Sequence, residues 1–172
     1  MLIDHTPADK AIWDYVYDTL HFHPSYEYKG HSFAVPLPFQ MPEPYAVYGI
    51  GDMSEKQIDL LNESMRDILI RITAAGQKIY ALDWQHSSFL FDPRNPAEMQ
   101  DQTVPDEHAP GGSYNAYFPA FIPDGDYYFF LDENLRFGYL GHPWREEVWV
   151  FGTELMQEIA AAYQSFGWTK LK

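Results

Sequence analysis

Three short runs of aromatic and aliphatic residues near the C-terminus constrain the fold of this chain more than any other feature. The runs are DYYFFL (126–131), LRFGYL (135–140) and EVWVF (147–151), separated by the turn sequences DEN and GHPWRE and preceded by PDG. Apolar runs of this length, bounded by glycine, proline and acidic residues, are typical of strands joined by hairpins. The sequence therefore predicts a C-terminal three-stranded antiparallel meander.

Capping residues predict about three helices around this meander. Thr6 is placed to cap a first helix, Ser54 and Gln57 form a capping box before a second helix that Gly76 ends, and Thr153 is placed to cap the last. Further strands are predicted at YAVYGI (45–50), KIYALDW (78–84) and SSFLF (87–91). Because helices and strands do not alternate regularly, we expect an α+β fold with a mainly antiparallel sheet packed by these helices.

We expect residues 1–172 to form a single domain, since neither an internal repeat nor a second periodic unit is visible. Prolines at 36, 38, 42 and 44 predict an extended connector before the first strand, with a short edge strand near 33–35. Residues 92–120 show no periodicity and many turn formers. Such a stretch is long for a connection inside a compact domain, and it is predicted to be an irregular insertion.

Composition excludes several classes of function. The chain of 172 residues has 25 acidic residues against 11 basic ones and a formal net charge of −14. This charge repels phosphate backbones and anionic lipid, so neither nucleic acid nor a membrane surface is expected as a partner. Cysteine is absent, which excludes disulfides, thiolate metal sites and a cysteine nucleophile. Without an apolar leader or a long apolar segment, the expected location is the cytoplasm.

Two bends at predicted strand ends carry a histidine close to a tryptophan. The first bend contains Asp83, Trp84 and His86, and the second contains His142, Trp144 and Arg145. If the two bends meet at one rim of the sheet, Asp83 can orient a histidine as a general base, or the groups can hold a ligand or metal. The simpler interpretation is that the tryptophans close the apolar end of the sheet and the histidines bond within their turns. These six residues are the candidate ligand or partner site.

Other polar patterns have simpler explanations, and we expect neither a metal site nor a cofactor. His21, His23 and His31 have a spacing that resembles metal ligation, but they lie in an aromatic, proline-rich connector. Asp124 and Asp126 suggest calcium by their pairing, yet a proline-aspartate-glycine run before a strand is far more often a hairpin turn. No catalytic residue is predicted, and an enzymatic role is not the leading expectation.

Several motifs resemble a family of small bacterial proteins, the domain of unknown function 2716. The resemblance rests on DWQHSSFLFDP, PDGDYYFFLDENLRFGYLGHPW and VWVFGTELM, and an HPSYE run at 23–27 also fits. It marks residues 80–86, 124–128 and 142–144 as recurring features. Two departures are Arg145, where the family pattern has an acid, and the segment 97–117, which looks like an insertion. The resemblance implies no activity.

The run GDYYFFLDENLRFGYLGHPW also resembles the closing meander of the Smi1/Knr4-type immunity proteins. That likeness implies a module that neutralises a toxin, often a basic nuclease, through an acidic surface.

Three functional hypotheses follow from the sequence. The leading one is a non-catalytic, acidic module that binds a protein partner, with toxin immunity as its concrete form. The second is a small-ligand, metal or enzymatic site at the rim formed by the two bends, and the third is a purely structural housekeeping domain. The sequence leaves the oligomeric state open.

Overall fold

The computed structural model describes residues 1–22 and 40–172. Before the main strands lie the helix α1 (Pro7–Asp14) and the π-helical turn η1 (Tyr15–Thr19). The following elements are β1 (Tyr45–Gly49), α2 (Glu55–Ile72), β2 (Ile79–Asp83), β3 (Ser88–Phe91), η2 (Pro96–Glu98), β4 (Gln102–Pro105), β5 (Ser113–Ala116), β6 (Tyr128–Asp132), β7 (Gly138–His142), β8 (Glu147–Phe151), α3 (Thr153–Ala162) and β9 (Thr169–Lys170). The predicted edge strand near 33–35 and the histidines at 23 and 31 lie outside the described residues.

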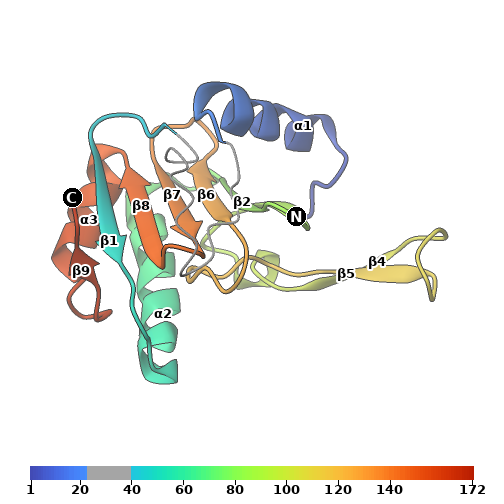
Figure 1. Ribbon diagram of the computed structural model, residues 1–172. Coiled ribbons are helices and arrows are strands. Elements are labelled where there is room, and N and C mark those ends of the chain that lie inside the picture. The colour runs from blue at the N-terminus through green and yellow to red at the C-terminus, as the bar shows by residue number, and fades with distance from the viewer. Residues whose placement is uncertain (23–39) are drawn as a thin grey trace.

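The main sheet has seven strands within the described part of the chain, in the order β3-β2-β6-β7-β8-β1-β9. Every neighbouring pair is antiparallel, and β6, β7 and β8 form the predicted meander. The two termini flank opposite edges: residues 1–3 bond to β3, and β9 pairs with β1 (Figure 1). The α+β prediction is confirmed.

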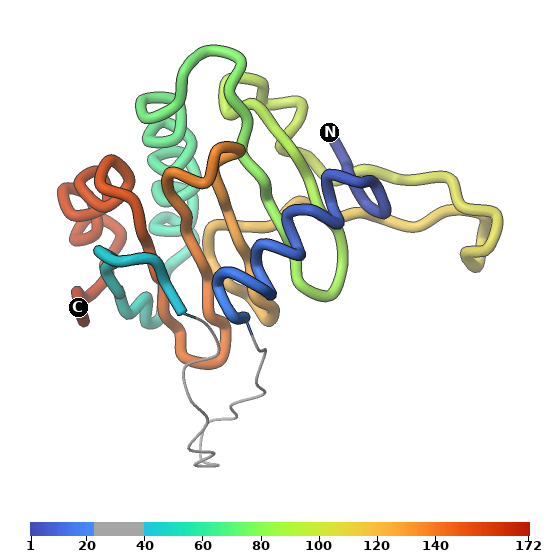
Figure 2. Tube along the Cα trace, turned by 90° about the horizontal axis from the view of Figure 1, so that it is seen from above, coloured from blue at the N-terminus to red at the C-terminus, as the bar shows by residue number. Residues whose placement is uncertain are grey.

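The side chains of the central strands point alternately to the two faces of this sheet and are buried in two separate cores. The helices α2 and α3 cover one face, where Met65 and Ile159 pack with Phe130. On the other face α1 and η1 bring Ile12 and Val16 into one cluster with Phe129. We refer to these faces as the α2 side and the α1 side. In both ribbon and tube views the strands lie between α1 and α2 (Figures 1 and 2).

Two tryptophans join α1 and η1 to the β2–β3 hairpin. The indole Nε1 of Trp13 donates to Ser88 Oγ at 3.0 Å, and that of Trp84 donates to Tyr17 Oη at 3.1 Å. Trp84 and Trp144 both pack against the α1-side core. The predicted role of these two rings, closing the apolar end of the sheet, matches their positions.

The predicted N-terminal capping residues hold for two of the three helices, whereas α2 ends at Ile72 and not at Gly76 as predicted, because Thr73 already has an extended backbone. Thr6 Oγ1 accepts from the Asp9 N–H, and Ser54 and Gln57 form the complete capping box. The last helix instead has Gly152 at its N-cap, with Thr153 as the first helical residue. Gly152 takes this place because its φ of 89° favours glycine.

Two strands of the meander begin later than predicted, since local bonds replace strand pairing. The N–H of Tyr127 bonds to Oδ1 of Asp126 at 2.7 Å, so β6 begins only at Tyr128. The Leu135 N–H donates to the Asp132 carbonyl at 2.8 Å inside the turn, and β7 begins at Gly138.

The segment predicted to be irregular contains regular structure. Between residues 92 and 120 lie η2 and a two-stranded sheet formed by β4 and β5. This hairpin extends away from the main sheet as an arm (Figures 1 and 2). The Tyr114 hydroxyl of β5 donates to Asp4 Oδ2 at 3.3 Å and so holds the hairpin to the N-terminal segment.

A membrane-spanning helix is not found: in residues 1–22 and 40–172, each helix is too short or too polar to cross a bilayer.

Candidate functional site

The two bends that the sequence singles out lie at the same edge of the main sheet. Asp83, the last residue of β2, is paired with Tyr128 at the start of β6. Tyr128 is paired in turn with Gly141, which precedes His142 near the end of β7. One strand therefore separates the bends. The sequence left open whether they share a rim of the sheet, and in the structure they do.

The side chains of the second bend face the α1-side core. His142 has no exposed surface and packs edge-on against the Tyr127 ring, with 4.8 Å between ring centroids. Burial, with the nearby Arg145 charge, lowers the pKa of His142 to about 3. Its Nδ1 accepts from the Arg145 N–H at 3.4 Å. His142 is therefore a neutral core residue that bonds within its own turn.

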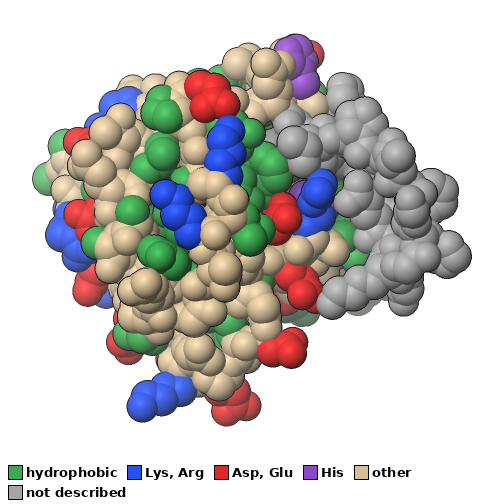
Figure 3. Space-filling model, turned by 60° about the vertical axis from the view of Figure 1, so that its left-hand side comes forward, with side chains coloured by type: hydrophobic (Ala, Val, Ile, Leu, Met, Phe, Trp, Pro, Cys, Tyr) green, Lys and Arg blue, Asp and Glu red, His purple; other side chains and the backbone are tan. Residues whose placement is uncertain are grey.

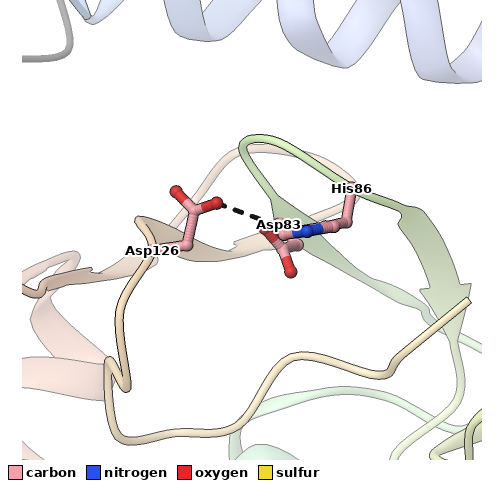
Figure 4. Close-up of side chains that lie close together, drawn as sticks. All are labelled: Asp83, His86 and Asp126. Atoms are coloured by element: carbon pink, nitrogen blue, oxygen red, sulfur yellow. Dashed lines mark hydrogen bonds and ion pairs between the residues drawn. The ribbon is translucent and has the colours of Figure 1, made fainter.

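The first bend contributes to a different cluster, formed by Asp83, His86 and Asp126. His86 Nδ1 lies 3.0 Å from Asp83 Oδ1 and 3.6 Å from Asp126 Oδ2. One potential ligand atom from each residue lies within 4.8 Å of the other two (Figure 4). The Asp83 and Asp126 side chains are 6% and 11% exposed, whereas the His86 side chain is 58% exposed. The cluster thus joins a buried acidic pair to a histidine that reaches solvent.

Burial and charge shift the protonation of this cluster. Burial raises the pKa of Asp126 to about 6, and the neighbouring Asp83 carboxylate adds to that rise. The hydrogen bond to Asp83 raises the pKa of His86. Asp126 therefore holds a proton more readily than an isolated aspartate does, and the imidazolium form of His86 is favoured.

A pocket of about 330 Å³ opens beside the cluster. Asp83 and His86 line it together with Asp101, residues 117–120, Asp124 and Tyr128. The Tyr128 hydroxyl donates to Asp124, and burial with this bond raises the pKa of Tyr128. Tyr128 and Phe118 belong to the α2-side core or pack against it, so the pocket opens on the α2 side.

Two further hollows adjoin this pocket along the α2 side. A hollow of about 300 Å³ shares Asp101 and residues 118–120 with it. An outer hollow of about 540 Å³, between α2 and the 96–100 segment, shares Asn62 and Met99 with the second. We call the three adjoining hollows the acidic groove.

Comparison with known proteins identifies the family of this chain. The model of one protein family, described as protein of unknown function (DUF2716), matches residues 4–156. The chain belongs to the DUF2716 family. A relative in Bacillus subtilis (strain 168), the uncharacterized protein YxiI, is 30% identical over 128 residues, which cover 69% of this chain and 71% of YxiI. No solved structure matches the chain.

The DUF2716 match spans both bends and the three cluster residues, and it confirms the family resemblance seen in the motifs. Neither this match nor YxiI bears on the likeness to Smi1/Knr4-type proteins, which stays a prediction. The family description names no activity, so the function of this DUF2716 member has to be argued from its own side chains.

The structure brings together only part of the predicted site. Asp83 and His86 form the cluster, whereas Trp84, His142 and Trp144 pack in the α1-side core. Arg145 lies in the second bend and pairs with Glu147, with 3.4 Å between Nε and Oε2.

Sequence reasoning missed the acidic groups that complete this site in the DUF2716 chain. These are Asp101, Asp124 and Asp126. The paired acids of PDGD were the available signal, but the hairpin turn was preferred over a calcium site as their interpretation. Asp126 takes part in that turn and also meets Asp83 across the β2–β6 pairing.

Proposed function

We propose that this chain is a non-catalytic binding module that holds a basic segment of a protein partner in the acidic groove. The observation that carries the proposal is the charge of the groove walls. They contain five carboxylates, one arginine and one histidine; the acidic residues are Glu63, Asp67, Asp83, Asp101 and Asp124. Such a strip attracts lysine and arginine side chains and repels acidic ones.

The groove also offers apolar surface between its charges. Tyr117 is 54% exposed, and with Phe118 it lines the pocket beside Asp124. An ammonium or guanidinium group is stabilised over an aromatic face as well as by a carboxylate. Charge and aromatic surface together therefore favour a cationic side chain over a free anion or a purely apolar ligand.

The chemistry of the lining favours binding over covalent catalysis. Among the described residues that line the groove, none is serine, threonine, cysteine or lysine. Nucleophilic catalysis commonly uses one of those side chains.

The groove also differs in charge from another face of the molecule. Figure 3 shows that face, on which acidic and basic side chains lie close together. In the described lining of the groove, five acidic residues stand against Arg66 and His86.

Toxin immunity is the concrete form of this proposal. It combines the net charge of −14 with the likeness of the meander to immunity proteins. A basic toxin would bind through the groove, and co-expression of the chain would restore the growth of cells that produce that toxin. A charge reversal in the groove would abolish the protection.

The proposal is tested with a fluorescent lysine-rich peptide and two double variants. Glu63→Lys with Asp67→Lys reverses two exposed charges of the groove, while Asp59→Lys with Glu107→Lys changes the net charge equally at exposed positions outside it. Measured by fluorescence anisotropy, the groove variant should weaken binding by about 10-fold and the control by less than about 2-fold. Equal losses in both variants would contradict a specific groove.

The second candidate is the small-ligand or metal site that the sequence suggested at this rim. The specific observation in its favour is the meeting of Asp83, His86 and Asp126.

A further inference from the structure

We propose that Asp83, His86 and Asp126 bind one divalent first-row transition-metal ion, such as Zn²⁺ or Mn²⁺. This site goes beyond the binding of a basic segment and does not rest on it. The sequence left a metal site at this rim only as an alternative, in which His86 acted with His142 and Asp83, and Asp126 was interpreted as part of a turn. The structure joins His86 to two carboxylates instead.

The spacing of the three groups fits one ion. Ligand atoms about 2.1 Å from a metal lie roughly 3.0 Å apart at octahedral angles and roughly 3.4 Å apart at tetrahedral angles. His86 Nδ1 lies 3.0 Å from an oxygen of Asp83 and 3.6 Å from an oxygen of Asp126. All three ligand atoms lie within 4.8 Å of one another (Figure 4). Small side-chain adjustments would therefore bring all three atoms to bonding distance of one ion.

Burial separates this cluster from an ordinary group of surface acids. The side chains of Asp83 and Asp126 are 6% and 11% exposed and lie against each other. In residues 1–22 and 40–172, neither carboxylate has a lysine or arginine within ion-pair distance, and His86 is the basic side chain that contacts both. Two buried carboxylates side by side need a shared proton or a cation between them. A divalent ion supplies that charge.

The ligand types select the class of metal. An imidazole nitrogen with two carboxylate oxygens suits zinc, manganese, iron and nickel, whereas calcium and magnesium prefer oxygen alone. Three protein ligands leave at least one coordination position for water or a small ligand. Asp83 and His86 line the 330 Å³ pocket, which has room for that ligand.

The test is an isothermal titration of the tag-free, chelator-treated full chain with Zn²⁺ and, separately, Mn²⁺. We expect one ion per chain, and His86→Ala should weaken binding at least about 10-fold. Because His86 is largely exposed, this variant should fold. His108→Ala is the matched control: that side chain is 87% exposed in the β4–β5 loop, and its removal should leave the affinity unchanged.

A second variant separates a metal site from a pair that merely shares a proton. Asp126→Asn removes the repulsion between the buried carboxylates, so it should keep or raise the melting temperature of the metal-free protein. It should also abolish the increase in melting temperature that Zn²⁺ gives to the wild type. The proposal is overturned if the wild type binds neither ion, if His86→Ala binds like the wild type, or if the Zn²⁺ stabilisation persists in Asp126→Asn. None of these readings depends on the peptide measurement.

Discussion

His86 and His142 lie on opposite faces of the main sheet. Their bends share an edge, because Asp83 is paired with Tyr128 and Tyr128 with Gly141. His86 lines the pocket on the α2 side, while His142 packs against Tyr127 in the α1-side core. The rim therefore holds one exposed polar site and one buried aromatic cluster rather than a single site built from both histidines.

The buried histidine predicts a specific acid sensitivity. The folded-state pKa of His142 is about 3, below the value of about 6.5 for an unfolded histidine. The unfolded chain then binds the extra proton, so the contribution of His142 to stability is complete above pH 6.5. It is lost as the pH falls from 6.5 towards 3, with a slope of up to about 1.4 kcal/mol per pH unit.

Urea unfolding of His142→Gln at several pH values between 7 and 4 checks this. The variant should lose stability less steeply with acid than the wild type does. His108→Gln, at an exposed position, should follow the wild-type slope. Parallel slopes for His142→Gln and the wild type would show that His142 is already protonated in the fold.

Two glycines with similar backbone angles should respond very differently to alanine. Gly152 and Gly76 have φ values of 89° and 82°. A Cβ at Gly152 would lie 2.4 Å from Cβ of Phe137 and 2.6 Å from the Arg136 carbonyl oxygen, whereas nothing lies within 4 Å of one at Gly76. Gly76→Ala should cost about 1 kcal/mol and Gly152→Ala more than about 3 kcal/mol in urea unfolding. Equal costs would place Gly152 in a looser turn.

Two arginines near the end of α2 should also differ in importance. Arg94 donates to the carbonyls of Ile70 and Thr73 and to the Thr73 hydroxyl, and so satisfies the end of the helix. Arg71 forms an exposed ion pair with Glu158. Arg94→Met should lower the free energy of unfolding by about 1–3 kcal/mol, and Arg71→Met by no more than about 0.5 kcal/mol. Thermal or urea unfolding distinguishes them, and the reverse order would contradict this interpretation.

The aromatic wall of the groove makes a prediction of its own. Tyr117→Ser should weaken binding of the lysine-rich peptide about 3- to 10-fold, because a cation loses an aromatic face. Leu60→Ser is the control, since Leu60 is a comparably exposed apolar residue of α2 outside the groove lining. Fluorescence anisotropy gives both affinities. A loss shared by both variants would show that exposed apolar surface alone accounts for the effect.

Local chemistry explains how much of the fold could be predicted from the sequence. The capping box of Ser54 and Gln57 and the turn residues of the meander act over a few positions, and the structure confirms them. The β4–β5 arm escaped prediction because it buries little apolar surface: Ala116 is buried in the α2-side core, while Val104 and Tyr114 pack against that core only partly buried. Its strand β4 alternates only between intermediate and exposed positions.

The candidate site was only partly predictable, because it depends on strand register. Asp83 and Asp126 come from segments far apart in sequence, and only the β2–β6 pairing brings them together. The same register places His142 among aromatic rings, a fact that the GHPW motif does not encode. The single domain, the cytoplasmic location and the absence of nucleic-acid and membrane partners stay predictions.

The most direct test of the acidic groove is a site-resolved one. Backbone amide NMR spectra recorded during titration with the lysine-rich peptide report which residues meet it. The account predicts the largest shifts at positions 62–67, 99–101 and 117–120, with little change on the α1 side. Shifts spread evenly over the acidic surface, or centred on the α1 side, would contradict the groove as the binding site.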